Sequence, residues 1–156
     1  MSFDAELITT IIDRVESHAM ALGLFQTVNG HEPKSAPGNG THAAFWVDSF
    51  GPAIGSGLHA TSMLFVLNAR VNVSMTQLPA DAIDPKITSA IGKLIEAYTG
   101  DFELGGIGIR CVDLLGMGGG PTLGARAGYL TLDNTVYRVM TLTVPIIIDD
   151  IFDQVR

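Results

Sequence analysis

The chain has 156 residues, of which 47% are hydrophobic and 16% are charged, and its net charge is −7. This length predicts one domain over residues 1–156 with its own core, and a charged share below the ~25% of a typical soluble chain suggests that self-association hides part of the surface. The nine Lys and Arg are scattered singly and form no basic stripe, which argues against direct nucleic-acid binding.

The first predicted element is a helix over residues 4–22. Ser2 or Asp4 could cap its start, and Gly23 would end it. Its apolar positions recur at three- and four-residue spacing: Leu7, Ile8, Ile11, Ile12, Val15, Ala19 and Leu22. The opening "MSFDAELITT" is acidic where a signal peptide is basic, so we expect a soluble protein that is made and kept in a cytoplasm.

Strands are predicted next at residues 24–28 and 43–50, on either side of a polar loop rich in Gly, Pro and Asn. A long strand follows at 61–75. One of its faces is apolar throughout, comprising Met63, Phe65, Leu67, Ala69, Val71, Val73 and Met75, whereas the other includes Leu64, Val66, Asn68, Arg70 and Asn72. We therefore expect this strand to be buried on one side.

The second predicted helix runs from Asp84, as its N-cap, to Gly100, with Pro85 in the first turn. Its apolar stripe consists of Ile87, Ile91, Leu94, Ile95 and Tyr98. One face of this helix, like that of the first, needs to be covered.

The rest of the chain is predicted to be strands, at 102–106, 108–116, 128–132 and 136–148, the last two joined by the turn "DNT". Val136, Arg138, Met140, Leu142 and Val144 would share one face of the last strand. The longest apolar run there, "VPIII", is far shorter than the ~20 residues of a membrane span. Because helices and strands do not alternate regularly, we predict an α+β fold: a mainly antiparallel β-sheet with two α-helices packed on one face.

The stretch "GMGGGPTLGARAGYL" at 116–130 is the strongest candidate for a phosphate loop, yet its spacing fits neither known pattern. The third glycine of a dinucleotide motif would fall at Pro121, and a strand rather than a helix is predicted to follow. A Walker A loop needs Lys and then Ser or Thr where Ala125 and Arg126 stand. We therefore interpret the glycines as residues that let the backbone adopt conformations closed to other residues, in a loop that becomes ordered against a partner.

No other catalytic, cofactor or metal pattern emerges. The four histidines, His18, His31, His42 and His59, lack the spacing of metal ligands, and no G-x-S-x-G elbow is present. Cys111 is the single cysteine and is interpreted as a buried thiol. The acidic end, with Asp149, Asp150 and Asp153, could hold a cation or form a solvated tail whose Ile151 and Phe152 pack on a neighbour.

Taken together, "LNARVNVSM", "IDPKITSAIGKLIEAYTGDFELGG", "IRCVDLLG" and "AGYLTLDNTVYRVMTLTVPIII" resemble, in their order, the tail terminator proteins of long-tailed bacteriophages. These minor tail proteins cap the tail tube where it meets the head connector. The resemblance covers roughly residues 4–150 and includes no catalytic signature, so it implies a structural virion protein rather than an enzyme.

The resemblance implies a homo-oligomeric ring, six-fold in relatives, that forms head to tail, stops tube growth and docks the connector. The expected partners are therefore other copies of the chain, the tail tube protein and the head–tail connector protein, with DNA only as passing cargo, no membrane and no cofactor. The protein would be located in the virion tail, after assembly in the host cytoplasm. Flexible loops near 30–42, 51–59 and 116–127 would order against neighbours, and five residues there are the expected interface: Phe50, Leu58, Met117, Leu123 and Arg126.

Two alternatives stay open. A head–tail connector or other neck protein could have a similar fold, and the glycine-rich 116–124 stretch has no counterpart in the terminator family. A small enzyme or ligand-binding domain could instead use a cleft between loops 51–59 and 116–127, with Arg126, His59 and Asp48 as its polar groups.

Overall fold

The structure, a computed structural model, describes residues 3–54, 60–76, 79–106 and 109–154. It confirms the predicted α+β class. The elements in chain order are α1 (Ala5–Leu22), β1 (Thr27–Asn29), β2 (Thr41–Pro52), β3 (Ala60–Ser74), the 3₁₀ turn η1 (Ala80–Ala82), α2 (Ile83–Gly100), β4 (Ile109–Val112), β5 (Gly124–Leu132) and β6 (Thr135–Asp153).

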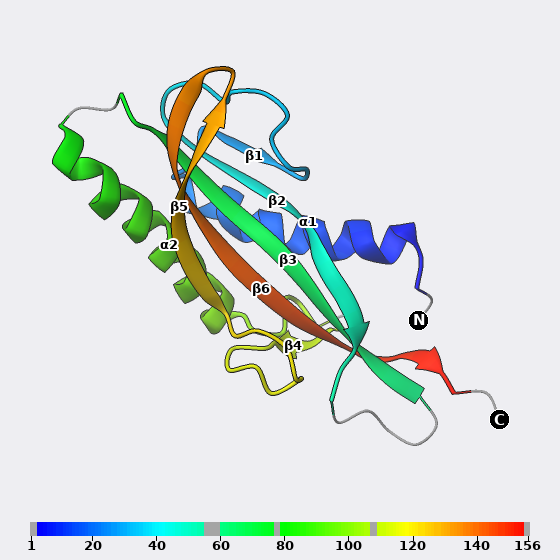
Figure 1. The fold of residues 1–156 in the computed structure, drawn as a ribbon. Coiled ribbons are helices and arrows are strands. Elements are labelled where there is room, and N and C mark those ends of the chain that lie inside the picture. The colour runs from blue at the N-terminus through cyan, green and yellow to red at the C-terminus, as the bar shows by residue number, and fades with distance from the viewer. Residues whose placement is uncertain (1–2, 55–59, 77–78, 107–108, 155–156) are drawn as a thin grey trace.

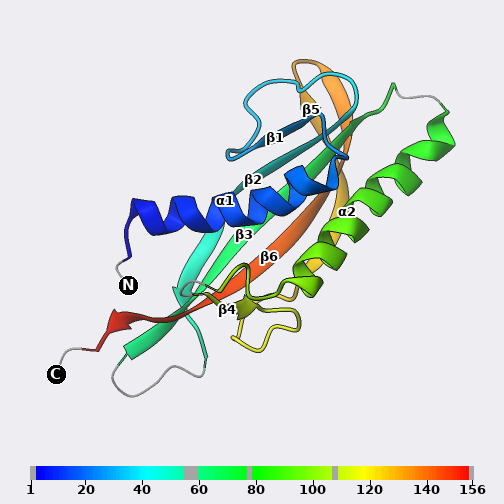
Figure 2. The ribbon, with the colours of Figure 1, turned by 180° about the vertical axis from the view of Figure 1, so that it is seen from behind.

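The strands form one curled sheet in the order β1-β2-β3-β6-β4, and β5 pairs with the N-terminal half of β6 (Figure 1). Every pairing is antiparallel except β1 with β2. The two longest strands, β3 and β6, lie side by side at the centre. Both helices cover the same face of the sheet, which Figure 2 shows from the helix side.

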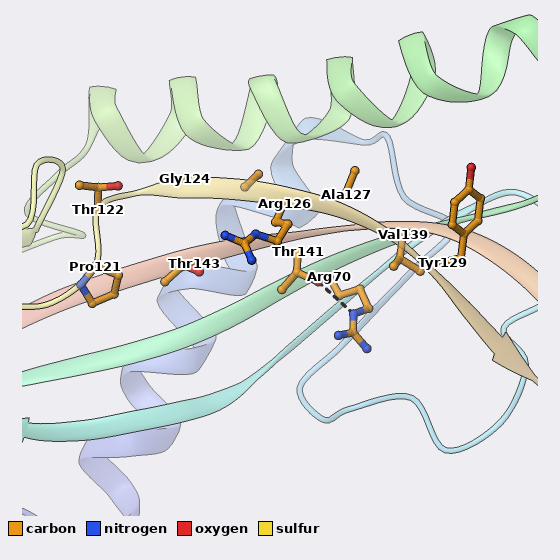
Figure 3. A pocket seen from close by; sticks show the side chains of 12 residues that line it. Arg70, Pro121, Thr122, Gly124, Arg126, Ala127, Tyr129, Val139, Thr141 and Thr143 are labelled. Atoms are coloured by element: carbon orange, nitrogen blue, oxygen red, sulfur yellow. Dashed lines mark hydrogen bonds between the residues drawn. The ribbon is translucent and has the colours of Figure 1, made fainter.

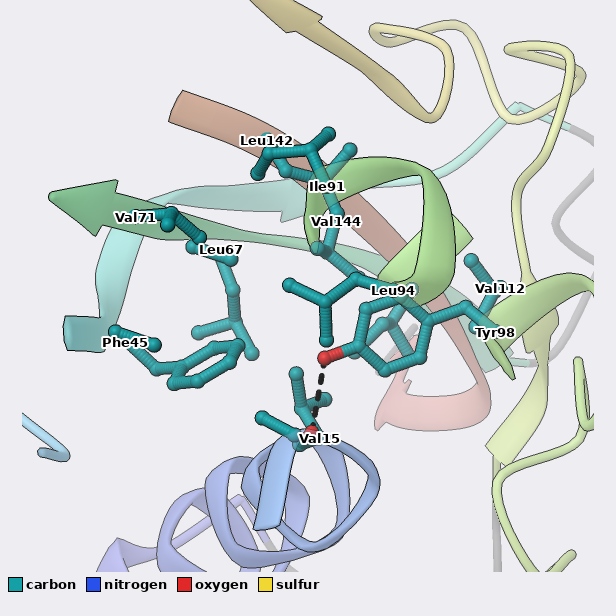
Figure 4. Close-up of a cluster of buried hydrophobic side chains, with 14 of the residues drawn as sticks. Val15, Phe45, Leu67, Val71, Ile91, Leu94, Tyr98, Val112, Leu142 and Val144 are labelled. Atoms are coloured by element: carbon teal, nitrogen blue, oxygen red, sulfur yellow. Dashed lines mark hydrogen bonds between the residues drawn. The ribbon is translucent and has the colours of Figure 1, made fainter. Parts of the chain in front are cut away.

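The core lies between that face and the two helices (Figure 4). The predicted apolar face of β3 is buried there from Met63 to Val73, while Met75, just after the strand, is exposed. On β6 the core side chains are Leu142, Val144, Ile146 and Ile148, so the buried side is shifted toward the C-terminus relative to the predicted face, and Val136 is exposed. Burial of these side chains supplies most of the stabilisation.

The ends of α1 follow the prediction. The Asp4 carboxylate accepts a hydrogen bond from the Leu7 N–H at 2.9 Å, as an N-cap does, and Gly23 ends the helix with φ +67°. The predicted turn between the last two strands also forms: Asp133 and Asn134 both adopt positive φ, the backbone of a two-residue hairpin turn.

Three local predictions were wrong. Asp84 does not cap α2, because η1 leads directly into the helix at Ile83, and the Asp84 carboxylate instead accepts a 2.9 Å hydrogen bond from Arg138 Nε. Residues 102–106 form turns rather than a strand: Leu104 is buried at φ +47°, and Gly105 and Gly106 also have positive φ. The strand predicted over 108–116 ends at Val112.

The predicted loop boundaries also change, since strands extend into all three loops at 41–42, 51–52 and 124–127. No helix in the described ranges is long and apolar enough to cross a membrane.

Candidate functional site

The glycine loop closes around a carboxylate of its own chain. Asp113 is buried directly after β4, and its two oxygens accept hydrogen bonds from the N–H groups of Met117 and Gly118, each at 2.8 Å. Backbone N–H groups that would hold a phosphate in a nucleotide loop therefore bind an internal anion here. The glycine turn is thus built around Asp113.

The same loop is held against the end of β2. The Ile54 N–H donates to the Gly118 carbonyl at 2.9 Å, and Leu123 N–H donates to the Leu114 carbonyl at 3.2 Å. At Gly119 the backbone has φ +91°, and a Cβ would lie 2.5 Å from Ile54 Cδ1, so a larger residue would strain the turn and displace Ile54. The mobility of this loop stays a prediction.

Three large apolar side chains are exposed on this loop and its contact with β2. Leu115 and Met117 are 78% and 79% exposed, and Ile54 is 69% exposed. We call these three residues the loop patch. Beside it lies an apolar pocket of about 290 Å³, to which Phe102, Cys111 and Ile147 contribute together with Leu115 and Met117. Exposed apolar surface of this kind is typical of interaction sites.

A second surface, which we call the arginine groove, lies along β5 on the sheet face opposite the helices (Figure 3). It has a volume of about 600 Å³, and its polar side chains include Arg70, Arg126, Thr141 and Thr143. Arg126 stands opposite Thr141 in the β5–β6 register, between Gly124 and Gly128. Because these glycines carry no side chain, the groove stays open on both sides of Arg126.

The two arginines of the groove differ in how they are held. Arg70 Nε donates to Thr141 Oγ1 at 3.1 Å, and its guanidinium lies 5.0 Å from the centre of the Trp46 ring. Its Nη1 is 3.9 Å from a Glu32 oxygen. Arg126 is exposed, and within the described ranges it has neither a hydrogen bond nor an ion pair. The groove thus holds one fixed guanidinium and one that is free to take an anion.

The structure separates the five predicted interface residues. Met117 belongs to the loop patch and Arg126 to the arginine groove, whereas Phe50 is 55% exposed at the end of β2, with its ring 5.3 Å from that of Phe3. Leu123 is partly buried against the core. Leu58 lies outside the described residues.

The polar groups of the alternative cleft do not come together in the described structure. Asp48 is on β2, where it accepts a 3.4 Å hydrogen bond from Asn68 Nδ2, and strands β3 and β6 lie between β2 and Arg126 on β5. His59 lies outside the described residues. Asp48 therefore does not line the arginine groove.

Two of the described histidines, His18 and His42, are held by neighbours. His18 Nε2 lies 2.9 Å from an Asp101 oxygen, and buried His42 bonds Thr27 Oγ1 through Nδ1 and the Asn39 carbonyl through Nε2. Since a carbonyl can only accept, Nε2 of His42 donates this hydrogen bond. Over the described ranges no three His, Cys, Asp or Glu side chains come close enough to hold a metal ion.

One buried acid lies within the helix layer. Burial, with a smaller contribution from Asp13, raises the pKa of Glu16 above 4.5, and its Oε1 has no hydrogen-bond partner among the described residues. Burial also raises the pKa of Tyr98, whose hydroxyl donates to the Val15 carbonyl at 2.9 Å (Figure 4). Both groups lie in the interior of the fold.

Sequence reasoning did not single out Asp113 or Arg70. The signal for Asp113 was available, because an aspartate followed at short range by glycines is typical of turns in which the side chain binds nearby N–H groups. Arg70 was assigned only to a strand face, and its place beside Arg126 depends on β5 folding back onto β6.

Comparison with protein-family models found no match. Comparison with curated protein sequences found none either.

Proposed function

We propose that this protein is a structural subunit that assembles with copies of itself into a ring, and that the ring is the tail terminator of a long-tailed bacteriophage. In that role it stops polymerisation of the tail tube and presents a face to the head connector. Two observations support this proposal: the sequence resembles the terminator family, and the fold is of the α+β class that the resemblance implies.

The observation that carries the proposal is the loop patch. Leu115, Met117 and Ile54 keep more than two thirds of their surface in water, although the loop beneath them is closed by its own hydrogen bonds. At roughly 25 cal/mol per Å², covering such side chains stabilises a protein contact by several kcal/mol. A closed loop that presents apolar side chains to solvent is well suited to contact another protein subunit.

The first experiment compares two variants with the same kind of substitution. Leu115→Ser/Met117→Ser removes most of the loop patch, whereas Met20→Ser alters a side chain that is 57% exposed on α1. Both variants are expected to fold with near-native stability, since exposed positions contribute little to it. The loop variant should lose assembly, measured by light scattering and negative-stain imaging, and the α1 variant should keep it.

The terminator role itself is tested with the tube protein of the same phage. Added to polymerising tubes, the wild-type protein should shorten the mean tube length and appear as an extra ring at one tube end. The loop-patch variant should leave tube length unchanged. Tubes of unaltered length and unlabelled ends with the wild-type protein would contradict the role, and label found only on isolated heads would favour a neck protein.

A further inference from the structure

The outer edge of β5 is open. Strand β5 pairs only with β6 among the described residues, so its other side presents backbone N–H and C=O groups without strand partners. Edge strands usually avoid pairing through prolines, bulges or several charges. From Gly124 to Leu132 the strand has no proline and its register with β6 has no shift, and Arg126 is its single charged residue. This edge is therefore suited to an extended segment of another chain.

The arginine groove beside that edge favours an acidic occupant. Arg126 is exposed there without a described partner, and Arg70 adds a second guanidinium to the same wall. The chain as a whole carries 16 acidic residues against nine basic ones. A guanidinium pairs with a carboxylate through charge-assisted hydrogen bonds, which gives the groove a preference for Asp or Glu side chains.

The chain offers such a segment at the end of β6. Residues 149–153 end β6 with a bulge at residues 149–151, and they contain Asp149, Asp150 and Asp153, of which Asp150 and Asp153 are exposed. Phe152 and Asp153 pair with Thr61 and Ala60 at the start of β3. These strand ends lie at the far end of the molecule from the turn between β5 and β6 (Figure 1). The side chains of Asp150 and Asp153 are thus exposed at one end of the fold, whereas Ile151 between them is buried in the core.

A single copy cannot bring its own acidic segment to its own groove. Both lie on β6: the groove side chains Thr141 and Thr143 precede the acidic segment, and Asp149 is six residues beyond Thr143. At about 3.3 Å per residue the separation is roughly 20 Å along a continuous strand, which cannot fold back on itself. Any contact between the two must join different copies.

We propose that the arginine groove of one copy binds the acidic end of β6, residues 149–153, of a second copy. Arg126 pairs with the incoming carboxylates, and the segment lies along the open edge of β5. Because the two contacting surfaces differ, the contact is head to tail, and repetition closes a ring or extends a filament. The inference deepens the proposed self-assembly and rests on it.

Two sets of substitutions break the contact from opposite sides. Arg126→Glu reverses the charge in the groove. Asp150→Asn/Asp153→Asn removes the two exposed acidic charges of the segment, and Asn suits residue 150 because that backbone has φ +50°, which Asn tolerates. Charge-matched controls are Lys93→Glu on α2 and Asp81→Lys on η1, both at exposed positions away from the groove.

Light scattering of each purified variant at low ionic strength gives the first result. Each of the two contact variants should associate about tenfold more weakly than the wild type, and both controls should match the wild type. Raising the salt concentration should weaken wild-type association, because the ion pairs become screened. Circular dichroism and thermal melting check that every variant is folded.

Mixing the two contact variants is the decisive test. The Arg126→Glu chain keeps an acidic segment, and the Asp150→Asn/Asp153→Asn chain keeps a groove, so an equal mixture should form a heterodimer near twice 16.5 kDa and stop there. A mixture in which both remain monomeric, or variants that assemble like the wild type, would overturn the inference. Assembly that survives these changes but is lost in the loop-patch variant would leave the proposed ring standing and place its contact elsewhere.

Discussion

Replacement of Asp113 by alanine tests whether the glycine loop is held by its own carboxylate. Asp113 is 3% exposed and accepts two backbone hydrogen bonds at 2.8 Å, from Met117 and Gly118. A hydrogen bond to a charged group contributes about 1.5–3 kcal/mol to stability. When both are lost in the alanine variant, water that reaches the exposed side of the loop can bond the freed N–H groups and recover part of that free energy. We therefore expect Asp113→Ala to lower the free energy of unfolding by about 3 kcal/mol.

For a domain of this size a loss of about 3 kcal/mol corresponds to a melting temperature lower by roughly 6–12 °C. Thermal and urea unfolding measure the stability, and amide hydrogen exchange locates the change. Exchange should accelerate most at Met117 and Gly118, while the core strand β3 should follow only the global loss.

Two further variants make the comparison sharp. Asp113→Asn keeps one acceptor oxygen and should lose about half as much stability, since one N–H donor is left without a partner. Asp48→Asn changes an exposed aspartate whose only hydrogen bond given by the structure is 3.4 Å long, and should alter stability by less than about 0.5 kcal/mol. If Asp113→Ala were as stable as Asp48→Asn, with unchanged exchange at Met117 and Gly118, the account of the loop would be refuted.

Further predictions concern the helix layer and the groove. Glu16→Gln should stabilise the protein by about 1 kcal/mol at neutral pH, because the ionised carboxylate is buried with an unpartnered oxygen. Since the pKa of Glu16 is raised in the folded state, the folded state binds the proton more tightly, and the advantage of Gln should grow as the pH rises above 4.5 and vanish below it. Urea unfolding at several pH values checks this. Tyr98→Phe should lower the free energy of unfolding by about 1–2 kcal/mol because it removes the buried hydrogen bond to the Val15 carbonyl. Tyr129→Phe, at a side chain that is 65% exposed, should have little effect, and thermal melting of both variants checks this. Arg126→Ala should weaken assembly in light scattering and leave the melting temperature unchanged; a lower melting temperature with intact assembly would argue for a structural role instead.

Sequence periodicity was sufficient where burial and local propensity agree. Helix α1 has an unbroken apolar stripe with Asp4 before it and Gly23 after it, so its limits were predicted almost to the residue. The long strand β3 was likewise evident from alternating side chains, and the hairpin turn at Asp133 and Asn134 from its composition. The α+β class followed from the order of these elements.

The errors arose where a side chain met a partner far away in the sequence. Asp84 has the composition of an N-cap, but Arg138 on β6 takes its carboxylate, and the chain enters α2 through η1 instead. The "FELGG" stretch at 102–106 was predicted to be a strand but forms turns between α2 and β4. Five residues of local sequence do not reveal that Leu104 is buried in such a turn.

Of the candidate site, the sequence could indicate residue types but not their grouping. Met117 and Arg126 were expected to share one interface because both lie in the stretch predicted to be a flexible loop, yet Met117 lies on the loop patch and Arg126 in the groove along β5. The partner of Arg126 within the groove, Arg70, is more than fifty positions away in the sequence and reaches it through the β3–β6–β5 pairing. Such a grouping depends on strand register, which local patterns do not encode.

The central claim is that this chain assembles with itself into a closed ring. The most direct measurement is the mass of the purified protein by light scattering across a wide concentration range, with negative-stain images of the same samples. The account predicts a discrete species near six times 16.5 kDa, imaged as a ring, whose population rises with concentration. A single species of 16.5 kDa at every concentration and at low salt would contradict it.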